Sequence, residues 1–204
     1  SMKSDRLFPL CALLLCLASA PLAAQGIQPP VPAPAPDAKG SNTSGFVMQD
    51  RLFERLHAAQ TVAEAKQIAE RIERRWHRSG SDTVDLLSKR AALAMASGDQ
   101  ALAVELLDRM IGLKPDWAEA YFQRAVVFVL LDDHRQAAND LGQALRLEPR
   151  HYKAMLALAG LMQKQGRKKP AYALYEHVLS LYPLHEIAQQ LADHLRADVR
   201  GQDL

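Results

Sequence analysis

The chain has little cysteine, and this limits how it can be stabilised. Its two cysteines, Cys11 and Cys16, both lie in an apolar segment near the N-terminus. The remaining sequence can form no disulfide and offers no cysteine nucleophile. We therefore expect the fold to depend on the packing of apolar side chains, which a chain of 204 residues can provide within one domain.

Residue patterns that indicate an enzyme or a metal site are also missing. The sequence has seven histidines, none of which pairs with another at a tight metal-ligand spacing. His185 and Glu186 begin like a zinc-protease motif, but Gln189 stands where that motif needs its second histidine. Since neither a glycine-rich phosphate loop nor a serine–histidine–aspartate arrangement is present, we expect no enzymatic activity, no cofactor and no metal.

Neither sign of charge predominates, and this balance bears on the kind of partner. Lysine and arginine number 25 and aspartate and glutamate 23, which leaves a formal net charge of +2. A nucleic-acid-binding chain would need a basic stripe. The longest basic cluster, Arg167 to Lys169, falls in an expected turn, where solvent, an anionic headgroup or a glycan can reach it. We expect no nucleic-acid partner.

What the sequence does contain is an internal repeat of 34 residues. Four sets of residues share this step: Pro115, Pro149 and Pro183; Ala91, Ala125 and Ala159; Ala103, Ala137 and Ala171; Leu113, Leu147 and Leu181. A repeat of this length is typical of a helix–turn–helix unit that stacks into a solenoid. Such solenoids present an extended surface that binds other proteins.

The unit at 118–151 shows the pattern most clearly. Tyr121, Ala125 and Phe128 follow one another at helical spacing and form one apolar stripe. Ala137 begins a second stripe with the same spacing. The small residues allow two helices to approach closely, while the large residues fill the space beside them.

These positions resemble the tetratricopeptide repeat (TPR) family, over three units at 84–117, 118–151 and 152–185. The resemblance implies an all-α fold, namely a right-handed superhelical solenoid of antiparallel helix pairs whose first helices line a concave surface. Arg124 departs from the family pattern, which usually has leucine there. We expect Arg124 to reach Asp140 on the second helix of its unit and form an ion pair.

The regions on either side of the three units are also expected to be helical. Residues 46–83 read as a degenerate helix pair, with Thr61 and Glu64 as a capping box, and we expect this pair to extend the superhelix. Residues 186–204 read as a capping helix and tail. Ile187, Leu191 and Leu195 are expected to face inward, and the polar residues of the other face would keep this end soluble.

The N-terminal segment reads as a sorting signal. Lys3 and Arg6 precede an apolar stretch, residues 7–17, that is shorter than the roughly 20 residues needed to span a bilayer. We expect a cleaved signal peptide at 1–24, a proline-rich linker at 25–45, and a mature chain in the periplasm without stable membrane insertion. A lipoprotein signal ending at Cys16 and an uncleaved anchor are the alternatives.

The resemblance assigns exposed positions of the first helices to the concave groove. The middle helix is unusual, because the run Ala125–Leu131 is entirely apolar, whereas a half-buried helix should show a polar face. The alternatives to a partner on this surface are that the chain's own N-terminal helix or proline-rich linker fills the groove, or that the superhelix is tightly closed. The residues we expect to contact a partner are Lys89, Met95, Phe122, Gln123, Val126, Val129, Leu130, Lys153, Leu156 and Gln163.

Some TPR proteins hold the C-terminal carboxylate of a partner with lysine and asparagine residues in these positions. Lys153 matches one such position, but Ser88, Ala92, Gln123 and Ala157 do not match the others. We therefore expect an apolar helix or an extended apolar peptide in the groove. The function we expect is a periplasmic protein-interaction scaffold or adaptor for envelope assembly or integrity. The alternatives are an assembly chaperone or export accessory, and a regulatory subunit of a cell-wall enzyme.

Overall fold

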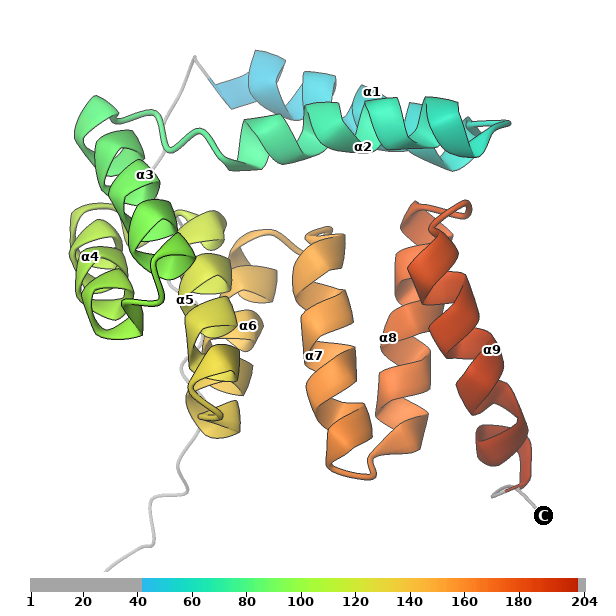
Figure 1. Cartoon of the computed structure of the whole chain (residues 1–204). Coiled ribbons are helices and arrows are strands. Elements are labelled where there is room, and N and C mark those ends of the chain that lie inside the picture. Colours follow the sequence, from blue (N-terminus) through green and yellow to red (C-terminus); the bar gives the residue numbers. More distant parts are fainter. Residues whose placement is uncertain (1–41, 202–204) are drawn as a thin grey trace, which may run out of the picture. The chain divides into compact units, whose positions relative to one another are not determined.

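The computed structural model describes residues 42–201, and within this range every regular element is an α-helix (Figure 1). The expected signal peptide at 1–24 lies outside the described residues, and so does most of the expected linker, although the first helix begins at Asn42, inside the linker range. The helices are α1 (Asn42–Ala58), α2 (Val62–Trp76), α3 (Asp82–Ala96), α4 (Gln100–Leu113), α5 (Ala118–Leu130), α6 (His134–Leu147), α7 (Tyr152–Lys164), α8 (Lys168–Leu181) and α9 (Glu186–Gly201).

Helices α3 to α8 form three antiparallel pairs, α3–α4, α5–α6 and α7–α8, that stack side by side (Figure 1). Small residues lie where the two helices of a pair approach each other. Ala125 of α5 and Ala137 of α6 are fully buried in one apolar cluster, and the equivalent alanines of the other pairs are buried in the same way. This arrangement confirms the predicted all-α solenoid.

The reversal between the two helices of each pair requires a left-handed backbone conformation. Gly98, Asp132 and Gly166 occupy equivalent positions one repeat apart, with φ of 78°, 60° and 74°. Glycine suits this conformation because it has no Cβ, and aspartate is one of the few other residues that tolerate it. In the first two pairs the next residue then caps the second helix with its side chain: Asp99 Oδ1 accepts a hydrogen bond from Leu102 N, and Asp133 Oδ1 from Gln136 N.

The α1–α2 pair does not extend the superhelix, so our expectation for residues 46–83 was wrong on this point. Both helices run across the turns that join successive repeats, and α1 contacts α8 of the last repeat (Figure 1). The apolar stripe of α2 is buried against the last two repeats, with Ile72 and Trp76 in one cluster with Tyr152 and Val178. The pair reaches the first repeat at Trp117, whose Nε1 donates to Trp76 O, while Leu93 of α3 is 70% exposed.

The start of α2 follows the predicted capping box in part. Thr61 Oγ1 accepts a hydrogen bond from Glu64 N at 3.2 Å, as expected for an N-cap. The Glu64 carboxylate accepts from the backbone N–H of Gln60 rather than from that of Thr61. Both side chains therefore satisfy backbone donors that the helix itself cannot satisfy.

Helix α9 packs on the last repeat as a further first helix. Ala188, Ala192 and Leu195 are its buried residues. Ile187, which we expected to face inward, is 60% exposed and faces the concave side. The expectation holds for Leu195 and fails for Ile187, because the small alanines, rather than the larger Ile187, meet the preceding helices. None of the helices in residues 42–201 is long and apolar enough to span a bilayer.

Candidate functional site

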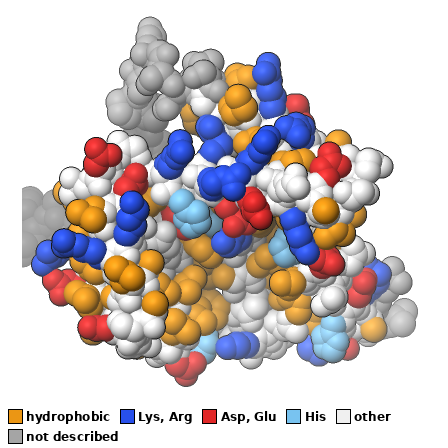
Figure 2. Space-filling view, turned by 45° about the horizontal axis from the view of Figure 1, so that its top comes forward, with side chains coloured by type: hydrophobic (Ala, Val, Ile, Leu, Met, Phe, Trp, Pro, Cys, Tyr) orange, Lys and Arg blue, Asp and Glu red, His pale blue; other side chains and the backbone are white. Residues whose placement is uncertain are grey.

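The concave side of the repeats carries three adjoining hollows, which together we call the groove. Val126 of α5 borders all three. Their volumes are about 470, 550 and 230 Å³. Helices α3, α5 and α7 supply much of the lining, and α2 adds a wall on one side. In Figure 2 hydrophobic side chains gather in a hollowed area below the centre of the view. The groove is therefore open and largely apolar.

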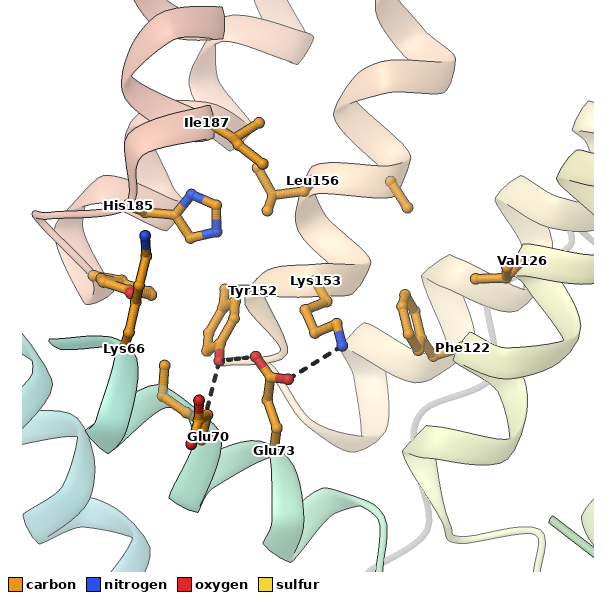
Figure 3. A pocket seen from close by; sticks show the side chains of 13 residues that line it. Lys66, Glu70, Glu73, Phe122, Val126, Tyr152, Lys153, Leu156, His185 and Ile187 are labelled. Carbon is orange, nitrogen blue, oxygen red and sulfur yellow. Dashed lines mark hydrogen bonds and ion pairs between the residues drawn. The ribbon is translucent and has the colours of Figure 1, made fainter. Parts of the chain in front are cut away.

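The first hollow lies between α2, α5, α7 and the start of α9 (Figure 3). Glu73 of α2 occupies its base, where it accepts hydrogen bonds from Tyr152 Oη at 2.7 Å and from Lys153 Nζ at 3.3 Å. Burial and the Glu73 carboxylate both raise the pKa of Tyr152, so the phenol stays protonated and can donate. Lys153 is already engaged with Glu73, which further argues against a carboxylate clamp.

The second hollow is more polar and lies between the end of α2, α3 and α5. Asp85 accepts hydrogen bonds from the hydroxyl and the backbone N–H of Ser79, and these bonds lower its pKa. Lys89 and Met95 line the same hollow. The third hollow, between α5 and α7, is formed mainly by apolar and small residues, among them Val129 and Gly160. The groove thus changes from polar to apolar along its length.

The structure brings most of the predicted contact residues together. Two of them do not border the hollows. Leu130 is 59% exposed beyond them, and Gln163 accepts a hydrogen bond from Tyr175 Oη at 3.0 Å within its own repeat. The residues that line the groove are Lys89, Met95, Phe122, Gln123, Val126, Val129, Lys153 and Leu156.

Other groove residues were missed by sequence reasoning because they come from helices outside the three repeats. Lys66, Glu70 and Glu73 belong to α2, while Ile187 belongs to α9. The 34-residue period assigns no position to α2. An N-terminal helix was one alternative occupant of the groove. Helix α2 does not fill the groove, because it forms one wall and leaves the hollows open. The expected linker lies mostly outside the described residues.

A polar cluster at the edge of the groove, buried except for His77, joins α2 to the repeats. Glu119 of α5 is 2% exposed, and its carboxylate lies 3.0 Å from His77 Nδ1 and 3.1 Å from His151 Nε2. His151 Nδ1 accepts a hydrogen bond from Ala154 N, so Nε2 carries the proton that bonds Glu119. The His151 ring stacks on Trp76, with ring centroids 4.3 Å apart. We call these four side chains the seam.

The electrostatics of the seam follow from its geometry. Burial on its own would raise the pKa of Glu119, but the hydrogen bonds from His151 and His77 more than offset this and lower the pKa to about 2. The same carboxylate raises the pKa of His77. His151 occupies the last position of the 118–151 unit, directly before α7. It is the N-cap of α7, but it is also fully buried and binds Glu119.

The predicted Arg124–Asp140 ion pair is confirmed. Arg124 donates from Nε and Nη2 to the two carboxylate oxygens of Asp140, both at 2.7 Å, and its Nη1 lies 2.8 Å from Asp108 of the preceding repeat. These carboxylates raise the pKa of Arg124, the Asp140 bond most strongly. The arginine that departs from the family pattern therefore links two repeats.

Among residues 42–201 we find no cluster of three or more histidine, cysteine, aspartate or glutamate side chains placed to hold a metal ion. The polar groups of the groove are instead bonded to one another, as Glu73 is to Tyr152 and Lys153. What the arrangement offers is an apolar surface rimmed by charge, which suits a peptide or a helix of another protein.

The comparisons with known proteins show the family. The chain belongs to the tetratricopeptide repeat family, whose model, described as tetratricopeptide repeat, matches residues 128–195. A TPR repeat-containing protein of Rhizobium etli is 30% identical over 206 residues, and the match covers 98% of each chain. The small glutamine-rich tetratricopeptide repeat-containing protein 2 of Mycosarcoma maydis is 27% identical over 48% of this chain and 28% of its own.

Solved structures share the repeat architecture. The TPR domain of Arabidopsis OM64 matches with a TM-score of 0.53 at 25% identity, over 56% of this chain and 95% of its own. The Yersinia enterocolitica type III secretion chaperone SycD, in complex with a peptide of the translocator YopD, matches with a TM-score of 0.55 at 12% identity, over 58% of this chain and 95% of its own. The domain class is that of a protein-interaction scaffold.

Proposed function

We propose that the groove binds an apolar segment of another protein and that the chain works as a scaffold or adaptor in the periplasm, supporting assembly or integrity of the cell envelope. It acts by holding its partner and carries out no reaction of its own, without cofactor or metal. The expected signal peptide at 1–24 supports the location, and the match to SycD, whose structure was solved in complex with a peptide, supports the mode of action.

The observation that carries this proposal is the position of Val126. It is half-buried and borders all three hollows, whereas its neighbour Ala125 is fully buried in the core between α5 and α6. Phe122, one turn earlier, borders two of them. Apolar side chains that remain partly exposed in a concavity usually mark an interaction site.

Site-specific crosslinking in cells tests the proposal. A photo-reactive residue at position 126 should give a discrete crosslinked partner, whereas the same residue at the exposed Asn139 of α6 should give none. Val126→Asp should then abolish binding of that purified partner while leaving the circular-dichroism helix signal unchanged. Partner binding that survives Val126→Asp, or equal crosslinking from both positions, would exclude the groove.

A chaperone role is the second candidate, and the match to SycD in complex with a translocator peptide favours it. The same crosslinking distinguishes the two roles. One stable partner supports an adaptor, while many unfolded clients support a chaperone. If the captured partner is a cell-wall hydrolase whose rate changes when the purified chain is added, the chain is a regulatory subunit. The expected location is tested separately by fractionating cells that express the full chain.

A further inference from the structure

The α1–α2 pair has an outer side turned away from the repeats, and this side is strongly cationic. Four arginines, Arg71, Arg74, Arg75 and Arg78, follow a helical spacing on one side of α2 and just beyond its end. They surround a shallow hollow of about 250 Å³ together with Met48 and Leu52 of α1. Figure 2 shows lysine and arginine side chains in a row across the upper part of the molecule, over this pair.

The charges of the pair are separated by side. Glu70 and Glu73 of α2 face the groove, and Glu73 is bonded to α7. Asp50 of α1 accepts from Arg150 Nη1 at 2.8 Å and so also faces the repeats. Arg74 approaches Glu70 only to 3.6 Å, with both side chains mostly exposed, and such a pair is weak. Of these three carboxylates only Glu70 approaches one of the four arginines, while Asp85 of α3 lies within electrostatic range of Arg78.

Apolar side chains lie beside this cationic surface. Phe46, Val47 and Met48, near the start of α1, are 63%, 44% and 48% exposed. Arg75 Nη2 donates to the carbonyl of Gly45 at 3.1 Å, which holds the start of α1 against the arginines. Exposed aromatic and aliphatic residues beside basic ones are the combination with which helices lie in a membrane interface.

We propose that this outer face docks reversibly on an anionic lipid surface, with the four arginines at the phosphates and Phe46, Val47 and Met48 in the headgroup boundary. Charge complementarity alone would also suit an acidic protein. The exposed Phe46–Met48 run favours lipid, because a bilayer offers anionic groups and apolar depth in one place. Arg78 borders both this outer hollow and the second hollow of the groove. The first hollow is lined by the other side of α2 and the third by α5, α6 and α7, so docking leaves these two accessible to a protein partner.

Co-sedimentation of the full chain with vesicles tests the proposal. Vesicles of phosphatidylglycerol and phosphatidylcholine in equal parts should bind the chain, and added salt should weaken binding, whereas pure phosphatidylcholine vesicles should not bind it. Each arginine near an anionic surface contributes about fivefold to the partition coefficient. The double variant Arg71→Glu and Arg74→Glu should therefore lower partitioning at least about 25-fold.

A matched control keeps the charge change but moves it. Arg135 and Arg146 are exposed arginines of α6, so Arg135→Glu together with Arg146→Glu alters the net charge equally and should leave partitioning within about twofold. Phe46→Trp adds an interfacial reporter, whose emission should shift to the blue only with anionic vesicles. Circular dichroism confirms that each variant is folded.

Three results would overturn the proposal. They are equal binding to both kinds of vesicle, equal losses in the two double variants, and no blue shift of Phe46→Trp with anionic vesicles. Failure to bind any vesicle would also overturn it, and would leave an acidic protein as the partner of this face. Loss of both vesicle binding and the blue shift on addition of millimolar inorganic phosphate, at constant ionic strength, would likewise overturn it in favour of a free-phosphate site. None of these results bears on the groove, which is tested through Val126.

Discussion

At the residue scale, a few charged side chains hold the repeats and the N-terminal pair together. Arg124 bonds two carboxylates from two different repeats, and Glu119 bonds two histidines from two different helices. Each is mostly or wholly shielded from solvent, where a hydrogen bond to a charged group contributes more than at the surface. Such groups make single substitutions at these positions informative.

Asp140→Ala should lower the free energy of unfolding by about 1–3 kcal/mol, because it leaves the guanidinium of Arg124 without its bidentate partner. Urea unfolding followed by circular dichroism measures this loss. Asp108→Ala is the control, since Asp108 bonds the same guanidinium from a side chain that is 54% exposed. It should change stability by less than about 1 kcal/mol. Equal losses in the two variants would contradict the importance we give to the Asp140 bond.

At the element scale, the sequence predicts what recurs along the chain and little else. The 34-residue step predicts the second helix of each repeat, the turns at Gly98 and Gly166 and the buried alanines. It does so because local spacing determines which face of a helix is buried. The Arg124–Asp140 pair was predictable because both residues belong to one repeat. The course of α1–α2 was not, since it depends on contacts such as Trp76 with His151, which are far apart in sequence and have no period.

In the candidate site, too, the residues of the repeats were predictable and those of the flanking helices were not. Residues on α3, α5 and α7, such as Phe122 and Val126, could be assigned to the groove from the register alone. The wall formed by α2 could not, because no repeat position corresponds to it. Ile187 was misassigned for a related reason: only the packing of α9 on the last repeat decides whether it or its smaller neighbour Ala188 is buried.

The close approach of α5 and α6 can be tested by adding volume. Ala125→Leu should lower the free energy of unfolding by about 1–3 kcal/mol, because Ala125 is fully buried and a larger side chain would force the two helices apart. Ala92→Leu is the matched control, since Ala92 lies on α3 at the edge of the open second hollow. Urea unfolding should find Ala92→Leu near the parent. A neutral Ala125→Leu would contradict the packing described for the pair.

At the scale of the whole molecule, the seam couples the N-terminal pair to the repeats in a pH-dependent way. Glu119 has a lowered pKa, so its contribution to stability is present above its ordinary value of 4.5 and is lost as the pH falls towards about 2. His77 has a raised pKa, so its contribution is present below 6.5 and is lost as the pH rises through the raised value. The seam should therefore contribute most to the stability of the fold between about pH 4.5 and 6.5.

Glu119→Gln should remove this dependence. In urea unfolding, the difference in stability between the parent and Glu119→Gln should be largest between about pH 4.5 and 6.5 and should shrink on either side. Fluorescence is a suitable probe, because both tryptophans of the chain, Trp76 and Trp117, lie at or beside the seam and are joined by a hydrogen bond of 2.8 Å. Glu105→Gln, on an exposed side chain, is the control. A difference that does not vary with pH would contradict the assignment.

The crosswise course of α2 also affects the elasticity of the protein. Stacked repeats contact only their neighbours, so a free solenoid can stretch and twist like a spring. Here one helix is attached near the turns before α5, α7 and α9, through Trp117, Tyr152 and Glu186, and therefore fixes the pitch of the superhelix along that edge. A partner would therefore meet a groove of fixed width. The protein would select partners by their size and would not adapt its curvature to wrap around them.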